Sequence, residues 1–149
     1  MFMATLHELV TPESIRLDVQ AGDWREAMQA AGDLLVTAGI SDDSYTASMI
    51  NNVEEHGPYI VITPGLAFAH ARADDDVHRT GMAWVRLAEP VRFGHESNDP
   101  VTLVAALAAM NSSSHIMATR QLATLLEDDQ KRAALESATT PEEFLAALA

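Results

Sequence analysis

The spacing of apolar residues changes along this chain, and that change constrains the fold more than any other feature of the sequence. From Asp23 to Ala38 the apolar residues recur with the 3.6-residue period of an amphipathic helix. Ser41-Asp42-Asp43 then supplies N-cap residues for a second helix that runs through Val53. The segment Tyr59–Thr63 (YIVIT) is instead β-branched and bounded by proline on both sides, which is typical of a buried strand. The chain therefore combines helices with at least one buried strand.

The same mixture continues toward the C-terminus. Two further strands and then three helices are predicted, at Gly81–Leu87, Pro100–Met110, Ile116–Leu126, Asp129–Glu136 and Pro141–Leu148. The two strands are separated by a loop from Glu89 to Asp99, and Thr140 is the expected N-cap of the last helix. Helices first, strands in the middle and helices last predict an α/β fold in which helices flank both faces of one sheet. At 149 residues and 48% hydrophobic composition, the chain suits a single domain spanning residues 1–149.

Charge and composition exclude several classes of protein. Twenty-two acidic residues against nine basic ones leave a net charge of −13, which opposes nucleic acid and anionic membranes and favours a basic protein partner. The chain has no cysteine, which excludes disulfides, thiolate nucleophiles and thiol-ligated metals. The longest apolar run, Val101–Met110, is much shorter than the roughly 20 residues of a membrane-spanning helix. The N-terminal sequence lacks the pattern of a signal peptide, so we expect a cytoplasmic protein.

The stretch ITPGLAFAHAR places His70 after a predicted strand and a Pro-Gly turn, at the rim of the expected sheet. A histidine at this position either satisfies a backbone group at the strand end or acts chemically, since imidazole titrates near neutral pH. Arg72 follows two residues later and favours an anionic ligand, although it can equally pair with the acidic run Asp74–Asp76. The residues alone leave both interpretations open.

A second histidine, His115, is expected in the first turn of the helix that follows Ser112, Ser113 and Ser114. Free N–H groups and the helix dipole favour an anion at such a place, so Ser113 and Ser114 are candidate phosphate-binding residues. His70 and His115 follow the two most strand-like segments, which can bring them to one edge of a sheet. Such a pair suits either metal ligation or nucleophilic catalysis in which one neutral imidazole takes a phosphoryl group.

The spacing of the histidines discriminates only weakly between these two uses. No His-x-x-x-His motif is present, and the fixed charge of Arg72 would repel a divalent cation. His95 and Glu96, in the loop FGHESNDP, can reach the same rim, although side-chain to backbone bonds within a structural loop are the preferred interpretation. A small metal-binding protein that uses His70, His95 and His115 is one alternative. His7, His56 and His78 have no supporting context and are interpreted as surface residues.

Three motifs in order, PGLAFAHAR, FGHESNDPV and LAAMNSSSHIMATRQLATLL, give the chain a family resemblance. It resembles the type-2 EIIA domains of the bacterial phosphoenolpyruvate-dependent sugar phosphotransferase system, the mannitol/fructose family, and within it the ascorbate-type components. The similarity covers nearly the whole chain and is densest from Pro58 to Asp128. It implies a mixed five-stranded sheet flanked by helices, in agreement with the pattern of the elements.

The resemblance also implies a phosphocarrier that needs no cofactor and no metal. His70 would accept a phosphoryl group on Nε2 from the phosphohistidine of HPr and pass it to a cysteine of a cognate EIIB for coupled carbohydrate uptake, with ascorbate as the candidate. His115 matches the second histidine of the family, which supports the phosphorylated state. A membrane EIIC would be reached only through these partners. A homodimer and a regulatory role, in which phosphorylation controls a transcription or metabolic target, both stay open.

One departure from the family pattern concerns positive charge. Mannitol-type members carry an arginine on a helix near the position where this chain has Asn51-Asn52. Arg72 is our hypothesis for the residue that replaces it beside the phosphoryl group.

Overall fold

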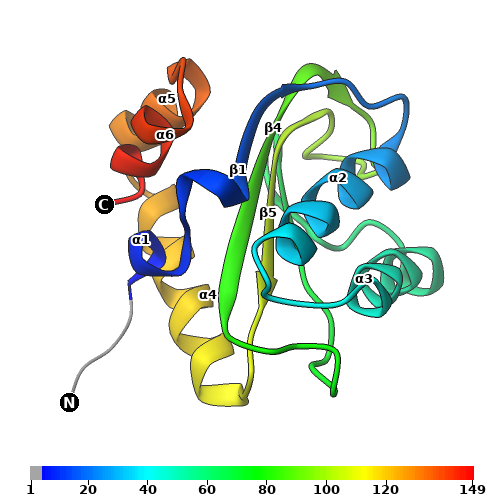
Figure 1. Cartoon of the computed structure of the whole chain (residues 1–149). Helices are drawn as coiled ribbons and strands as arrows, with labels where there is room; N and C mark the ends of the chain where they lie inside the picture. Colours follow the sequence, from blue (N-terminus) through cyan, green and yellow to red (C-terminus); the bar gives the residue numbers. More distant parts are fainter. Residues whose placement is uncertain (1–4) are drawn as a thin grey trace.

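The computed structural model describes residues 5–149; residues 1–4 of the predicted domain lie outside the described part. Figure 1 shows a central sheet with helices on either side. In chain order the elements are α1 (Leu6–Leu9), η1 (Pro12–Ser14), β1 (Ile15–Val19), α2 (Trp24–Thr37), α3 (Asp43–His56), β2 (Val61–Thr63), β3 (Leu66–Ala69), β4 (Gly81–Val91), β5 (Val101–Ala108), α4 (Ser112–Leu126), α5 (Asp129–Ser137) and α6 (Pro141–Ala147).

The strands form one mixed sheet with the order β1-β4-β5-β3-β2. Strand β5 runs antiparallel to β4 and parallel to β3, and β2 closes the far edge as an antiparallel neighbour of β3. Strand β1 pairs parallel with β4 at the other edge. The expected α/β fold with a mixed five-stranded sheet is therefore confirmed.

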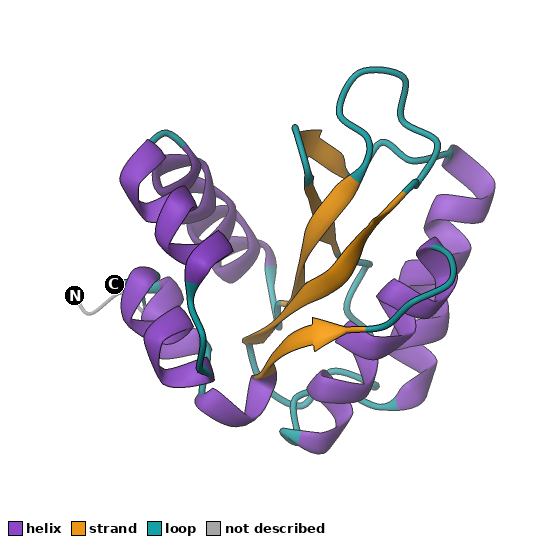
Figure 2. Ribbon diagram, turned by 90° about the horizontal axis from the view of Figure 1, so that it is seen from above, coloured by secondary structure: helices purple, strands orange, loops and turns teal. Residues whose placement is uncertain are grey.

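Helices cover both faces of this sheet, as Figure 2 shows from above. Helices α2 and α3 pack on one face, over a core that includes Met28, Leu35 and Met49. Helices α1, α4, α5 and α6 lie on the other face, over a core that includes Trp84 and Phe144. The central strand β5 is buried on both faces, which explains why its sequence is almost continuously apolar instead of alternating.

Two of the five strands were not predicted from the apolar pattern. Strand β3 has the sequence LAFA, whose small residues follow directly on the Pro64-Gly65 turn and carry no β-branched signal. Strand β1, IRLDV, does alternate apolar and polar residues, but the alternation lasts only five residues and was not recognised as a strand. Gly65 has φ +80°, so glycine is the residue that can turn the chain from β2 into β3 without strain.

Helices α2, α5 and α6 begin and end within about one residue of the prediction, α3 continues past Val53 to His56, and α4 begins earlier than predicted. The serines were expected to precede that helix, but Ser112 is its first residue and Asn111 is the N-cap. The Asn111 side chain accepts a hydrogen bond from the Ser114 amide at 2.8 Å. Asparagine and serine are about equally good caps, so the sequence alone does not single out Asn111. Thr140 caps α6 as predicted, accepting from the Glu143 amide at 3.1 Å.

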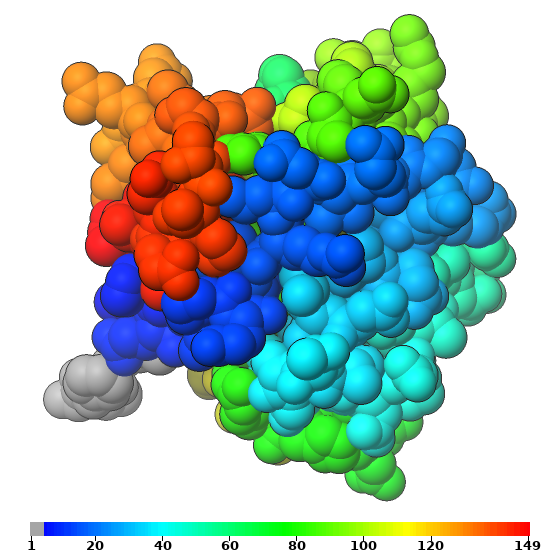
Figure 3. All heavy atoms as spheres, turned by 45° about the horizontal axis from the view of Figure 1, so that its top comes forward, coloured from blue at the N-terminus to red at the C-terminus, as the bar shows by residue number. Residues whose placement is uncertain are grey.

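The two ends of the described chain pack together. In Figure 3 the N-terminal segment, in dark blue, lies beside the C-terminal helices, in orange and red. The Lys131 ammonium donates to the backbone oxygen of Ala149 at 2.7 Å, and the Leu6 amide donates to the Gln121 side chain at 2.8 Å. The first contact joins α5 to the end of the chain after α6, and the second joins α1 to α4.

No helix within residues 5–149 is both long and apolar enough to cross a membrane. The longest helix, α4, has 15 residues, and a helix that crosses a bilayer needs roughly 20.

Truncating Phe144 should lower the free energy of unfolding more than a change at the surface of the same helix. Its ring is fully buried against Trp84, with the ring centroids 5.5 Å apart. Phe144→Ala removes this contact and leaves a cavity, so we expect a loss of about 3–5 kcal/mol in the free energy of unfolding, measured by chemical denaturation. Glu142→Ala, on the exposed face of α6, should change it by less than about 0.5 kcal/mol. Similar values for the two variants would contradict this account of the core.

Candidate functional site

His70 owes its position to the alternation of strand β3. Leu66 and Phe68 point into the core beneath α4, whereas Ala67 and Ala69 point toward α2 and α3. His70 comes directly after the strand and follows the alternation of Phe68, so its ring lies on the α4 side, half-buried.

His115 lies in the first turns of α4, which begins shortly after β5 ends. Because β3 and β5 are parallel, both strands end at the same edge of the sheet. The ring centroids of His70 and His115 are 5.2 Å apart, with an angle of 59° between the planes. The predicted convergence of the two histidines is confirmed.

Two aromatic rings complete the surroundings of His70. Phe68 lies beneath it with a centroid distance of 5.0 Å, and Tyr59 meets it edge to face at 6.4 Å. No motif in the sequence marks Tyr59, which the apolar pattern predicts only as the start of a strand. The His70 ring is thus contacted by the aromatic rings of Phe68 and Tyr59, and it is only half-buried.

One hydrogen bond determines which nitrogen of His70 is free. Nδ1 lies 3.2 Å from the backbone oxygen of Phe68. A carbonyl oxygen only accepts, so Nδ1 carries the proton in this bond. In the neutral ring the lone pair is then on Nε2, on the opposite side of the imidazole from the strand.

The surroundings also favour the neutral form of His70. Burial lowers its pKa below the ordinary value, and the nearby charge of His115 lowers it further, while the bond to Phe68 opposes both effects. A neutral imidazole is the form that can attack an electrophile. The lowered pKa therefore favours the neutral ring, and the bond to Phe68 leaves the lone pair of that ring on Nε2.

The start of α4 contributes hydrogen-bond donors next to this pair. The first residues of any α-helix have amide groups without intrahelical acceptors, which here are those of Ser112 and Ser113. The Ser114 amide is already bonded to Asn111, so only its hydroxyl is available to a ligand. The Ser113 side chain lines a shallow hollow on the outer face of α4 with Ile116 and Arg120.

Arg72 is exposed and lies in a small hollow with Ser48, Asp74 and Asp76. Within residues 5–149 its guanidinium forms no ion pair with these carboxylates. The hollow that Arg72 shares with Ser48 borders α3, so Arg72 lies on the side of the strand end that faces that helix.

The loop that contains His95 serves a structural purpose. His95 Nδ1 accepts from the amides of Ser97 and Asn98, and the Asp99 carboxylate accepts from the amides of Phe93, Gly94 and His95. These bonds confirm the preferred interpretation of internal side-chain to backbone bonding.

The loop also lies far from the histidine pair. The loop leads into the start of β5, whereas His70 and His115 follow the ends of β3 and β5. The loop and the histidine pair therefore lie at opposite ends of the strands (Figure 1). At the loop's end of the strands, the Asn98 side chain donates to the Val61 carbonyl and the Gly65 amide donates to the Asn98 carbonyl. A site formed by His70, His95 and His115 does not exist in this fold, and residues 5–149 contain no group of three or more metal-binding side chains. The interpretation of His7, His56 and His78 as surface residues is confirmed, since all three are exposed.

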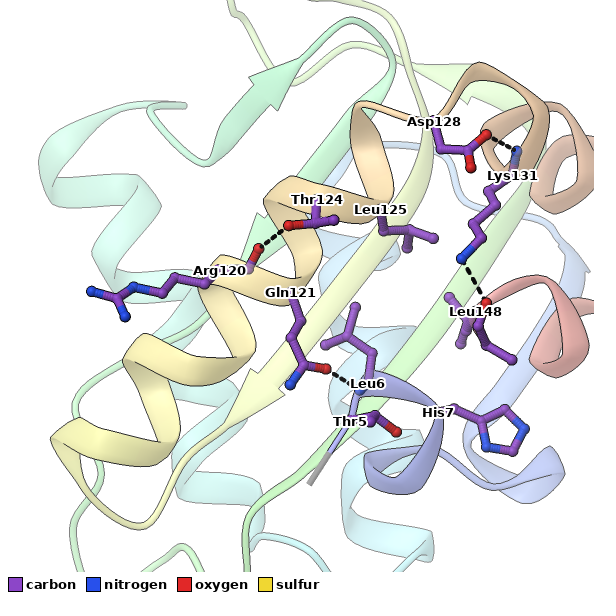
Figure 4. Close-up of a pocket in the computed structure, with 11 residues that line it drawn as sticks. Thr5, Leu6, His7, Arg120, Gln121, Thr124, Leu125, Asp128, Lys131 and Leu148 are labelled. Carbon is purple, nitrogen blue, oxygen red and sulfur yellow. Dashed lines mark hydrogen bonds between the residues drawn. The ribbon is translucent and has the colours of Figure 1, made fainter. Parts of the chain in front are cut away.

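A larger hollow lies elsewhere on the molecule, between α1, α4 and the C-terminal helices (Figure 4). It has a volume of about 540 Å³ and is lined by residues that include Leu6, Arg120, Leu125 and Leu148. Neither His70 nor His115 lines it, so it is separate from the histidine pair.

Comparison with known proteins decides the family. Residues 8–149 match the family model described as phosphoenolpyruvate-dependent sugar phosphotransferase system, EIIA 2. The chain belongs to this family. It is 38% identical over 142 residues to the ascorbate-specific PTS system EIIA component of Shigella flexneri, covering 94% of this chain and 92% of that protein.

Solved structures agree with this membership. The crystal structure of IIA mannitol from Escherichia coli superimposes with a TM-score of 0.82 at 31% identity, covering 94% of this chain and 99% of the other. The complex of Escherichia coli enzyme IIAMtl with phosphorylated enzyme IIBMtl gives a TM-score of 0.82 at 29% identity, covering 93% and 96%. This EIIA chain is therefore at family level a component of the phosphotransferase system, with ascorbate-specific relatives.

The geometry predicts an unusual titration of His70. In a titration followed by NMR of the ring protons, the pKa of the His70 imidazole should lie below the ordinary histidine value of about 6.5. His115→Gln removes one of the two effects that lower the pKa, so in that variant the midpoint should rise but stay below 6.5, because burial is the larger cause.

The same shift has a consequence for stability. The unfolded chain takes up a proton at His70 near pH 6.5, whereas the folded chain does so only at lower pH, so His70 should destabilise the fold as the pH falls below about 6.5. His70→Gln should lack this contribution. A midpoint at or above 6.5 in the wild type would show that the ring is not desolvated.

Proposed function

We propose that this EIIA chain is a phosphocarrier that receives a phosphoryl group on His70 Nε2 from phosphorylated HPr and passes it to a cysteine of a cognate EIIB. The observation that carries the proposal is the His70–His115 pair, with ring centroids 5.2 Å apart and the His70 proton held on Nδ1 by Phe68. A neutral, oriented nucleophile with a second imidazole beside it suits phosphoryl transfer, which depends on positioning and charge stabilisation more than on acid-base chemistry.

The first transfer exchanges one nitrogen–phosphorus bond for another. The Nε2 lone pair of His70 attacks phosphorus, the bond to the donor histidine breaks, and its electron pair returns to the donor ring. In the second transfer a cysteine thiolate of EIIB attacks, the bond to His70 breaks, and His70 regains its neutral form. The Nδ1–H bond to Phe68 can persist throughout, because neither step uses that nitrogen.

The phosphoryl group adds negative charge to a chain whose net charge is already −13, so local donors must offset it. His115 is the nearest, since its ring contacts His70. The Ser113 amide at the start of α4 and the Ser114 hydroxyl are the next candidates, supported by the helix dipole. No metal is needed for this role.

The partners follow from the relatives. One structural neighbour is a complex with phosphorylated enzyme IIB, which supports EIIB as the acceptor, and the acidic surface of this chain suits docking of a donor with a basic face such as HPr. Ascorbate-specific relatives support ascorbate as the transported carbohydrate. The protein would act in the cytoplasm and reach a membrane EIIC only through its partners.

Phosphorylation should be lost with His70 and impaired with His115. The protein is incubated with phosphoenolpyruvate, enzyme I and HPr, and labelling is followed by intact mass and phosphorus NMR. We expect one acid-labile phosphoryl group on the wild type and none on His70→Ala. His115→Ala should slow transfer by on the order of a hundredfold, the cost of losing one donor to a charged transition state.

His78→Ala is the matched control, because the His78 side chain is exposed and pairs with Asp42, while its backbone amide, which the substitution keeps, bonds to Ile40. It should label as the wild type does. A wild type that stays unlabelled would exclude the phosphocarrier role. Labelling of the wild type without transfer to a cysteine of the cognate EIIB would favour a regulatory role.

Arg72 should make a smaller contribution. An exposed ion pair is worth up to about 1 kcal/mol, so Arg72→Ala should slow labelling of His70 by about fivefold if its guanidinium reaches the phosphoryl group. Arg92→Ala makes the same change of charge at an exposed position in the loop at the opposite end of the strands and should have no effect. Equal rates for Arg72→Ala and the wild type would remove Arg72 from the site.

A further inference from the structure

The hydroxyl of Tyr45 lies between the two strand ends that lead to the histidines. Tyr45 is in the first turn of α3 and is fully buried. Its oxygen accepts a hydrogen bond from the Ala71 amide at 3.0 Å and lies 2.6 Å from the Leu107 carbonyl oxygen, to which it donates. Ala71 follows His70 in the chain, and Leu107 is in the last part of β5.

This hydroxyl takes the place of a backbone bond. The last paired residues of β3 and β5 are Ala69 and Ala106. If the same register continued, the Ala71 amide would bond directly to the Leu107 carbonyl. Here the Tyr45 oxygen is inserted between them, so the strands part without leaving either backbone group unsatisfied.

Tyr45 acts on the backbone near both histidines from the opposite face of the sheet and contacts neither imidazole. Helices α3 and α4 lie on different faces (Figure 1), so Tyr45 cannot touch a ligand held between His70 and His115. It instead joins the backbone beside His70 to the strand that leads through the Asn111 cap to His115. The hydroxyl is protonated at neutral pH at the ordinary tyrosine pKa, and burial raises the pKa of Tyr45 further, to about 12.

We propose that Tyr45 is a positioning residue for phosphoryl transfer: its hydroxyl holds the ends of β3 and β5 at the separation that lets His70 and His115 engage one phosphoryl group. This inference rests on the phosphocarrier function proposed above. The segment after Ala71 has no regular structure as far as the isolated bridge of Val77 with Ser41, so few other bonds hold the backbone next to His70.

Tyr45→Phe tests the inference, because it removes the hydroxyl and keeps the ring that fills the core. Thr46→Val is a closely matched control: it deletes a buried hydroxyl from the next residue of the same helix, and that hydroxyl has no hydrogen-bond partner within the described residues. Transfer from phosphorylated HPr is measured as kcat and KM, and exchange of the Ala71 amide proton is measured by NMR on the unphosphorylated protein.

In Tyr45→Phe we expect kcat to fall by on the order of tenfold to a hundredfold, as for a misplaced catalytic group, with KM for HPr within about twofold of the wild type. The Ala71 amide should exchange faster by about tenfold or more. Thr46→Val should match the wild type in all three quantities. Partial unfolding would also lower the apparent kcat at an unchanged KM, so kcat is referred to the folded fraction of each variant, measured by circular dichroism.

Two results would overturn the inference while leaving the phosphocarrier role intact. One is a Tyr45→Phe protein that accepts the phosphoryl group at the wild-type rate. The other is a Thr46→Val protein that loses as much kcat as Tyr45→Phe. Failure of the wild type to accept a phosphoryl group would instead exclude the proposed function, and the inference with it. The exchange of the Ala71 amide proton tests the hydrogen bond to Tyr45 whether or not the protein accepts a phosphoryl group, since it is measured on the unphosphorylated protein.

Discussion

The parallel pairing of β3 with β5 is the interaction on which the histidine pair depends. Parallel neighbours end at the same edge of a sheet, so residues that are far apart in the chain emerge side by side there. The pairing is held inside two apolar layers, one beneath α2 and α3 and one beneath the C-terminal helices, which leaves little freedom for either strand to slide. A slip of one residue would turn His70 to the α3 face and away from His115.

This arrangement resolves a conflict between burial and charge. The imidazole of His70 is desolvated enough to be neutral, yet the phosphoryl group that we propose it carries is strongly charged. The conflict eases because the floor around the ring is apolar, from Phe68, whereas the open side faces the start of α4 and His115. An imidazole in this setting is a nucleophile before transfer and has donors beside it afterward.

Local sequence signals located most of the helices and three of the strands. Capping residues such as Thr140 act within one turn, and an amphipathic period is a property of a single segment, so both can be recognised without knowledge of the fold. Strand β3 was missed because LAFA has no alternation and owes its conformation to its neighbour in the sheet. Strand β1 was missed although IRLDV alternates, because the alternation spans only five residues. The start of α4 was predicted near Ile116 instead of Ser112, because Asn111 and the three serines are all good N-cap residues.

The sequence by itself determined the fold class, the family resemblance and both histidines of the candidate site, since the apolar periods and the three motifs are properties of short contiguous segments. Only the tertiary structure decided that His95 belongs to the opposite end of the strands and that the bond to Phe68 leaves Nε2 as the free nitrogen of His70. It alone revealed Tyr45, which no motif marks, because its partners Ala71 and Leu107 become neighbours only when α3 packs on the sheet. Hydrogen bonds between distant segments depend on how layers pack, and no local pattern encodes that packing.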